Sequence, residues 1–351
     1  MSYPNRILAL ALLGPLAAPL AAQATVRPIP RVARSWESVA VPAAMRIQPP
    51  ASDLDFIGPL AAPDSRQEGV IGAPRESEVV NSTRFVDVQF HGAHVGASSF
   101  EQGLGSITTQ RGGWKAAVGD YDPTASSFAV EIGTEASFYD FGGGSPVPGV
   151  SDPFNDVYDT SLAGRFLVRS GERFEWYGGV QLGVSGEDAA DLGDSLYAGG
   201  ALALRYQAVP EFAFLVGVAG LSRYEDSAWI LPYIGFDWRA SERLRVLVEA
   251  AEIHIDYRVS ESWNAGLLTV YDLRQYRLND EGPLHGGAFR DEDIRAGATL
   301  GWKASDNVRI ELEAGKVIWR ETRFYDGQSG LIGEFETSSP TYLRLGLRLS
   351  F

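Results

Sequence analysis

The stretch Thr341–Phe351, TYLRLGLRLSF, decides the fold class of this chain. One set of alternate positions is apolar: Leu343, Leu345, Leu347, Leu349 and Phe351. The other set is mostly polar: Tyr342, Arg344, Gly346, Arg348 and Ser350. Because successive side chains of a strand point to opposite faces, the segment is predicted to be a strand with one apolar wall and one polar wall. A terminal strand of a soluble domain can have this pattern, but arginine on its inner face would be unusual.

The N-terminal residues 1–24 are predicted to be a cleaved export signal. A charged start at Arg6 precedes a short apolar run, and Ala22-Gln23-Ala24 fits a small-x-small cleavage site. The mature chain would then begin near Thr25. The alternative, a membrane anchor or buried helix, is disfavoured because prolines interrupt the run and it is shorter than the roughly 20 residues that span a bilayer.

The composition narrows the class of exported protein. There is no cysteine, which excludes disulfide-stapled folds, thiol catalysis and cysteine-bound metal. The formal net charge is -15, as in many soluble acidic proteins. A transmembrane barrel is compatible with such a composition, because its strands alternate lipid-facing and lumen-facing residues. A soluble exported β-protein is the alternative.

Two regions differ in pattern. Residues 25–82 are rich in proline and have no sustained period, which predicts an extended or disordered periplasmic segment. A small plug folded into a barrel mouth is the alternative for this segment. From Thr83 onward, strand-length segments of alternating character are separated by clusters of glycine, aspartate, serine and proline. Residues 83–351 are therefore predicted to form one β-domain.

The links between these segments alternate in length. Short links are predicted at 120–125, 169–173, 208–211, 239–242, 259–262 and 303–307. The links between them are predicted at 97–103, 141–154, 186–193, 223–228, 249–252, 276–289 and 326–338. Bacterial outer-membrane barrels have an even strand number, with short periplasmic turns and longer outer loops. The alternation predicts an antiparallel transmembrane β-barrel of 14 strands, with 243–260 as two short strands. If 243–260 is one strand, the strand number becomes odd and another element must also be wrong, so a barrel of 12 strands is the alternative.

The alternation also assigns the inner wall. The predicted lumen-lining residues are Glu175, Arg205, Arg245, Asp256, Arg258, Asp293, Arg295, Arg309, Glu311, Glu313, Arg344 and Arg348. Acids and bases interleave, so they could line a water-filled channel or pair with one another and fill the interior. A β-sandwich would also alternate. Aromatic residues near strand ends favour the barrel, because such rings lie at the headgroup level of a membrane: Trp176, Tyr206, Trp238, Trp263, Trp302 and Trp319.

The terminal stretch resembles the C-terminal signal of outer-membrane β-barrel proteins, an alternating last strand that ends in phenylalanine. The resemblance implies recognition by the barrel-assembly machinery through Tyr342, Leu345, Leu347, Leu349 and Phe351. A separate physical argument concerns its pairing. An open strand edge inside lipid is prohibitive, so this strand is predicted to pair with the first one, near Thr83–Val95.

A second resemblance lies in residues 229–260 and 293–325, which are similar to an uncharacterised family of outer-membrane barrels, domain of unknown function 6268. The positions that carry it are Pro232, Gly235, Trp238, Tyr257, Gly301 and Gly315. It covers roughly residues 85–351 and implies a fold and a membrane, with no activity to carry over. The proline-marked corner expected after the 243–249 strand is replaced here by Glu249-Ala250-Ala251-Glu252.

No constellation of catalytic residues is recognisable in the sequence. His91 and His94 point to opposite faces of a strand, and the row His254-Asp256-Arg258 is better explained as lumen ion pairing. Catalysis, cofactors and metal sites are therefore not predicted, although a barrel-embedded hydrolase is kept as a minor alternative. The acidic balance disfavours nucleic acid as a partner.

Acidic residues crowd or flank several predicted loops: Glu187, Asp188, Asp191, Asp194, Asp280, Glu281, Asp291, Glu292, Asp326, Glu334 and Glu336. They form either a solvated anionic rim or weak calcium or magnesium bridges to anionic lipid headgroups. Taken together, the sequence predicts a barrel in the outer membrane of a Gram-negative-type bacterium, in contact with its lipid. The expected function is passive passage of small polar solutes. The alternative is a filled, non-conducting barrel that presents acidic loops.

Overall fold

The computed structural model describes residues 83–121, 126–154, 156–225, 227–249 and 251–351. The predicted export signal at 1–24 and the proline-rich segment at 25–82 lie outside these residues. Within them, no helix has the length and apolar character needed to cross a membrane. The helical content of this part of the chain is a single short 3-10 turn, η2 (Glu101–Gly103).

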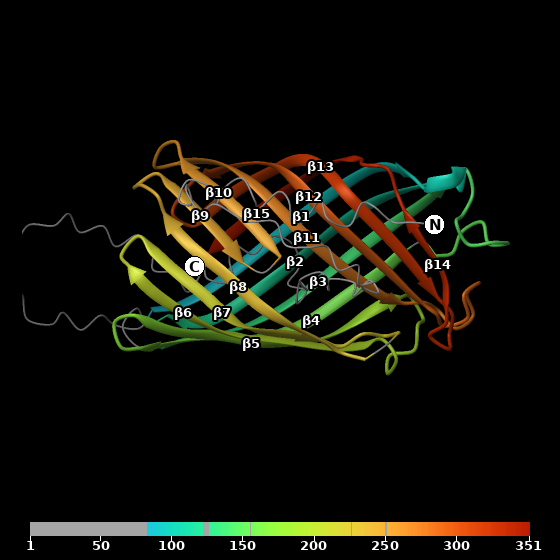
Figure 1. Cartoon of the computed structure of the whole chain (residues 1–351), viewed down its shortest axis with the longest axis horizontal. Coiled ribbons are helices and arrows are strands. Elements are labelled where there is room, and N and C mark those ends of the chain that lie inside the picture. The colour runs from blue at the N-terminus through green and yellow to red at the C-terminus, as the bar shows by residue number, and fades with distance from the viewer. Residues whose placement is uncertain (1–82, 122–125, 155, 226, 250) are drawn as a thin grey trace, which may run out of the picture. The chain divides into compact units, whose positions relative to one another are not determined.

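The described residues form one antiparallel sheet that closes on itself (Figure 1). Its strands are β1 (Thr83–Ser99), β2 (Ser106–Tyr121), β3 (Ser126–Gly142), β4 (Asp156–Ser170), β5 (Phe174–Glu187), β6 (Leu196–Val209), β7 (Phe212–Leu221), β8 (Trp229–Arg239), β9 (Leu244–Glu249), β10 (Glu252–Arg258), β11 (Trp263–Arg277), β12 (Ala288–Lys303), β13 (Val308–Tyr325), β14 (Leu331–Glu336) and β15 (Thr341–Ser350). Consecutive strands from β1 to β14 pair with each other, and β15 pairs with β1 and β13.

The barrel has 14 strand positions in its wall, as the sequence predicted. The β14 and β15 segments pair with successive parts of β13, β14 at Glu321–Tyr325 and β15 at Val308–Lys316. They are therefore one wall strand interrupted between them. The predicted loop 326–338 is wrong in its second half, because residues 331–336 continue the β13 hairpin instead of leaving the wall.

The first and last strands close the barrel, which confirms the predicted pairing. Asp87–Val95 lies opposite Ser350–Tyr342, and the Val86 and Phe351 backbones exchange two hydrogen bonds of 3.0 and 2.8 Å. Phe351 lies at the same end as the short turns, on the left in Figure 1, which is the turn end hereafter. The longer connections lie at the opposite end, the loop end.

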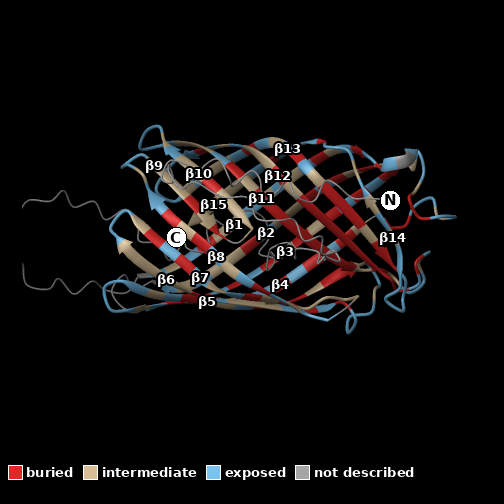
Figure 2. Ribbon diagram, in the orientation of Figure 1, coloured by how far each residue is buried: buried red, intermediate tan, exposed pale blue. Residues whose placement is uncertain are grey.

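The outer wall is apolar and the inner wall polar, the reverse of a soluble domain. Buried and exposed residues alternate along the strands (Figure 2), and in β3 the alternation runs almost without a break. The exposed positions are the large apolar ones: Ile230 is 78% exposed, Val180 68% and Val118 57%. Meanwhile inward Glu131 and Arg165 are buried and lie 3.0 Å apart. Such a wall is stable where lipid covers it.

The region 243–260 consists of two short strands, β9 and β10, as predicted. They end well before the loop end: β9 pairs with β8 only up to Gly235, and β10 pairs with β11 only up to Val270. Beyond them, β8 and β11 have no pairing with each other in the described residues. Instead β11 continues toward β5, where Arg277 lies opposite Gly186 in a parallel bridge. The Ser185 hydroxyl donates to the Gln275 carbonyl at 2.9 Å.

Candidate functional site: the barrel interior

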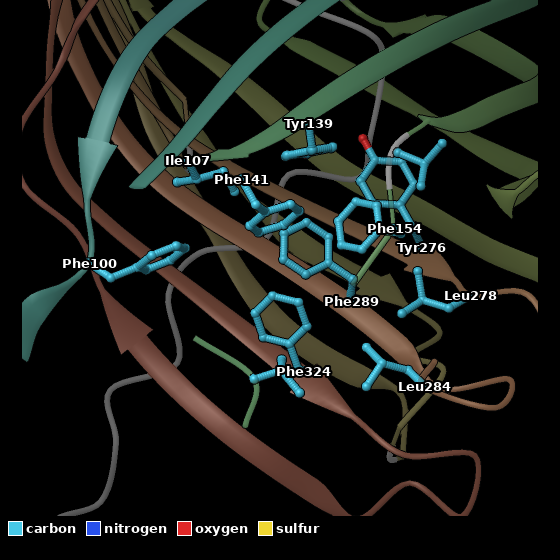
Figure 3. Close-up of a cluster of buried hydrophobic side chains, with 12 residues drawn as sticks. Phe100, Ile107, Tyr139, Phe141, Phe154, Tyr276, Leu278, Leu284, Phe289 and Phe324 are labelled. Carbon is cyan, nitrogen blue, oxygen red and sulfur yellow. The ribbon is translucent and has the colours of Figure 1, made fainter. Parts of the chain in front are cut away.

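The loop half of the interior holds an apolar core, the aromatic plug. Its members are Phe100, Ile107, Tyr139, Phe141, Val147, Phe154, Val157, Tyr276, Leu278, Leu284, Phe289 and Phe324 (Figure 3). The rings contact one another closely, with 4.6 Å between the centroids of Phe154 and Phe289 and 5.0 Å between those of Phe289 and Phe324. Edge-on and tilted ring pairs of this kind add to the free energy of apolar burial.

Strands and loops contribute differently to the plug. Most members are inward residues at the loop ends of β2, β3, β4, β11, β12 and β13. Val147 and Phe154 come from the connection between β3 and β4, and Leu284 from the connection between β11 and β12. The first of these connections begins at Gly143 and Gly144, whose φ angles of 71° and 125° are accessible chiefly to glycine. This turn sends the loop back over the barrel mouth.

Directly beneath the plug, toward the turn end, lies a buried group of charges, the charge network: Arg111, Glu135, Asp272, Arg274, Asp291, Asp293, Arg295 and Arg320. On β2, β3, β11, β12 and β13, a plug residue and a residue of the charge network lie a few positions apart. In β3, for example, Glu135 lies four residues nearer the turn end than Tyr139. The two layers therefore stack along the barrel axis.

Asp291 is the centre of the charge network. Its carboxylate accepts hydrogen bonds from Arg111 at 2.9 Å, from Arg320 at 2.8 and 2.9 Å, and from the Tyr139 hydroxyl at 3.0 Å. Both guanidinium groups are nearly inaccessible to solvent. Buried charges need such pairing, because their loss of hydration is otherwise uncompensated. The Tyr139 hydroxyl also links the charge network to the plug.

A second part of the network connects β3, β11 and β12. Arg274 donates to Glu135 at 3.1 Å and contacts Asp272, which also accepts from Arg295 at 2.8 Å. Glu135 is also 2.8 Å from the His91 ring nitrogen. Positive and negative groups alternate through the layer, so its net charge is small.

The predicted lumen residues lie mainly in the turn half of the barrel. Pairs link neighbouring strands: Arg205 to Glu175 at 3.0 Å, Arg245 to Asp237 at 2.8 Å, Arg344 to Glu313 at 3.4 Å, and Arg348 to Asp87 at 2.6 Å. Arg205 also reaches across β7 to Asp237 on β8, at 3.3 Å. Asp293 and Arg295 belong to the charge network instead. Asp256, Arg258, Arg309 and Glu311 lie at the turn ends of β10 and β13, and the Arg309 side chain is exposed.

The aromatic plug and five of the eight residues of the charge network were not predicted from the sequence. Arg111, Glu135 and Arg320 were not singled out, although Arg111-x3-Lys115 and Glu131-x3-Glu135 have the period of a strand face. Asp291 and Glu292 were predicted to flank a loop as part of an acidic rim, but both lie in β12 and are buried. They are strand residues because β12 begins at Ala288, so their charges are paired inside the protein.

The residues of the predicted assembly signal divide between the two faces of β15. Tyr342 is buried against Val95 and Val317, with the Arg295 guanidinium 5.6 Å from the centre of its ring. Leu345 is 55% exposed on the outer face, and Phe351 is exposed at the end of the strand. Leu347 and Leu349 are partly exposed.

In the part of the chain that the structure describes, no three His, Asp or Glu side chains are grouped to hold a metal ion. The predicted acidic rim is partly engaged in pairs: Asp194 accepts from Arg277 at 3.2 Å, and Glu334 from Arg323 at 3.0 Å. Next to this rim, burial raises the pKa of the loop residue Tyr224 above its ordinary value. Its hydroxyl donates to the Ser195 carbonyl at 2.7 Å.

Residues 182–349 match the model of the family described as Domain of unknown function (DUF6268), which confirms the resemblance over that range. No curated protein matches the sequence. Among solved structures, the COG4313 outer membrane channel from Pseudomonas putida F1 is 11% identical, with a TM-score of 0.42 over 81% of this chain and 100% of that one. The P. putida toluene transporter TodX is 10% identical, with a TM-score of 0.37 over 76% and 90%. The KdgM porin is 11% identical, with a TM-score of 0.31 over 75% and 99%.

Proposed function

We propose that this protein is a passive outer-membrane channel for small polar solutes, and that the aromatic plug holds it closed in the present conformation. The observation that carries the proposal is the construction of the plug. Val147, Phe154 and Leu284 belong to loops, so they can leave the mouth without breaking any strand pairing. The plug lies above charged side chains of both signs, which suit hydrated solutes.

A location in the outer membrane of a Gram-negative-type bacterium is supported by the outer wall. Large apolar side chains are exposed along it, and tryptophans gather near the turn end: Trp176, Trp238, Trp263 and Trp302. Aromatic rings of this kind favour the boundary between lipid and water. In such a barrel the turn end faces the periplasm and the loop end faces outward. Recognition of β15 by the barrel-assembly machinery is part of the same proposal.

The second candidate is a filled barrel that conducts nothing. The charge network favours it, because Asp291 and the two arginines that donate to it are buried, as in a rigid core. The two candidates differ in what the loops do. In a channel the plug opens and the network beneath it rearranges or becomes hydrated, whereas in a filled barrel neither layer moves.

Planar-bilayer recording distinguishes these candidates. In a channel, replacing Phe154 with serine should increase the open probability, because a polar group at the centre of the plug attracts water. Leu192→Ser is the matched control, since Leu192 is an exposed loop residue, 66% accessible, outside the plug. Liposome swelling with sugars and amino acids of graded size then gives the size limit. If wild type and Phe154→Ser are both silent at every voltage, in preparations that are correctly folded by heat-modifiability, the channel proposal fails.

A further inference from the structure

The wall between β8 and β11 is incomplete in the loop half. Residues 229–234 of β8 and 271–277 of β11 extend beyond the short β9–β10 hairpin, and no backbone pairing joins them. We call this boundary the seam. The barrel is closed there by β11 turning inward to meet β5, at Arg277 and Gly186. As a result, the loop halves of β6, β7 and β8 are left outside β11, and we call these three segments the flap.

The flap overlaps the outer face of β11. Tyr271 and Leu273 lie on the same face of β11 as Leu267, which is 57% exposed, yet they are only 8% and 1% exposed. They are covered by inward residues of the flap, Tyr197, Leu221 and Leu231, with which they form one apolar cluster. Two layers of the barrel wall therefore overlap here, and the surface between them is apolar.

The flap stays paired with β5 through β6, and side chains hold its opposite side, at β8, in a group we call the latch. The ring of Trp229, at the start of β8, is in contact with two guanidinium groups. Its centre lies 4.5 Å from the Cζ of Arg223 and 4.4 Å from the Cζ of Arg290 in β12. Glu225 accepts from both arginines, at 2.9 and 3.1 Å. In the described part of the chain, these side-chain contacts join the flap to β12 without any strand pairing between them.

The free edge of β8 is suited to remaining unpaired. Arg239 donates its amide to Glu211 on the β7 side, so by strand alternation the even-numbered positions of β8 direct their amide nitrogens away from β7. Pro232 occupies one of these positions and has no N–H to leave unsatisfied. Proline is confined to such edge positions in sheets.

We infer that the seam is a lateral gate, through which small apolar solutes pass between the barrel interior and the outer leaflet. When the latch opens, the flap swings away from β11 and uncovers the path lined by Tyr197, Leu221, Leu231, Tyr271 and Leu273. The pairing of β6, β7 and β8 with one another is kept. This inference shares the membrane location with the proposed function and needs no opening of the aromatic plug.

The absence of cysteine permits a direct test by cross-linking. The double variant Glu225→Cys/Arg290→Cys places one thiol on the flap side and one on β12, for closure with a short bifunctional maleimide. Intact cells that produce the protein are then mixed with 1-N-phenylnaphthylamine, an apolar dye that fluoresces once it enters lipid. Before cross-linking the latch is absent, and dye uptake should exceed that of wild type severalfold. After cross-linking, uptake should fall below that of wild type.

Controls distinguish passage through the gate from a general leak around a damaged barrel. Each single cysteine variant receives the same reagent and should not lose uptake, and Trp229→Leu, a milder change to the latch, should raise uptake without any cysteine. Heat-modifiability on gels confirms that every variant is folded. Equal dye uptake by the cross-linked and open forms of the double variant would overturn the inference. Because the recordings on Phe154→Ser test polar conduction, failure of the plug proposal and failure of the gate give different results.

Discussion

Replacing Asp291 with asparagine tests whether the charge network is a dry layer. The substitution keeps the volume of the side chain and removes one buried negative charge, while Arg111 and Arg320 remain. Each guanidinium is nearly inaccessible and donates to this carboxylate at 2.8–2.9 Å. Breaking a buried ion pair by removing one partner costs about 3–5 kcal/mol. The folded-to-unfolded ratio should therefore fall roughly a hundredfold to several-thousandfold.

Reversible urea titration of the protein in lipid vesicles, followed by tryptophan fluorescence and by heat-modifiability, measures this loss. Asp152→Asn is the matched control, since Asp152 is exposed in a loop and its charge is lost at the same loop end. Surface changes of this kind usually alter stability by about 0.5 kcal/mol or less. A loss of about 1 kcal/mol or less for Asp291→Asn would refute the reasoning. It would mean that water hydrates the two arginines, and hence that the interior is open at this level.

Three other changes test the β5–β11 contact, the assembly signal and the lumen. Gly186→Ala should destabilise the barrel by about 1–3 kcal/mol in the same titration, because its Cβ would lie 2.8 Å from the Arg277 carbonyl oxygen. The control Gly164→Ala, whose Cβ meets nothing within 4 Å, should leave stability nearly unchanged. Equal effects of the two substitutions would contradict the β5–β11 contact. Deleting Phe351 should lower the yield of heat-modifiable barrel in cells while leaving folding into detergent intact, and an unchanged yield in cells would argue against the assembly signal. In the Phe154→Ser background, Arg309→Glu should shift the reversal potential in a salt gradient toward cation selectivity, and an unchanged potential would place Arg309 outside the conducting path.

The fold could be predicted because its determinants are local. Side-chain alternation and link length are properties of short segments, and in a membrane barrel both faces of every strand must match their surroundings. Even the two short strands at residues 243–260 could be recognised, because Glu249 to Glu252 marks a break in the alternation. The boundary of β12 was harder, since strand length above the membrane is set by the neighbouring β13 hairpin and not by apolar residues. Asp291 and Glu292 were therefore grouped with the acidic rim beside the preceding loop.

The plug and the seam could not be predicted from the same signals. Val147, Phe154 and Leu284 lie in segments without any period, and their inward position depends on how the loops fold back over the strands. The seam exists because β9 and β10 are short, which leaves the loop half of β11 free to meet β5. Gly186 and Pro232 are the two residues whose types are related to the seam. A glycine that permits close approach and a proline at an edge are common, so neither residue alone indicates such an arrangement.

On the proposed gating mechanism, the overlap of the flap on β11 also couples the barrel to the mechanics of its membrane. At the turn end the full set of strands shares one circumference, whereas at the loop end β11 joins β5 directly and the flap lies over it. The molecule therefore takes up less area in one leaflet than its strand number would require. Unrolling the overlap increases that area, so tension in the outer leaflet performs work in favour of the unrolled form. A barrel built in this way can respond to stretching and to lipid packing.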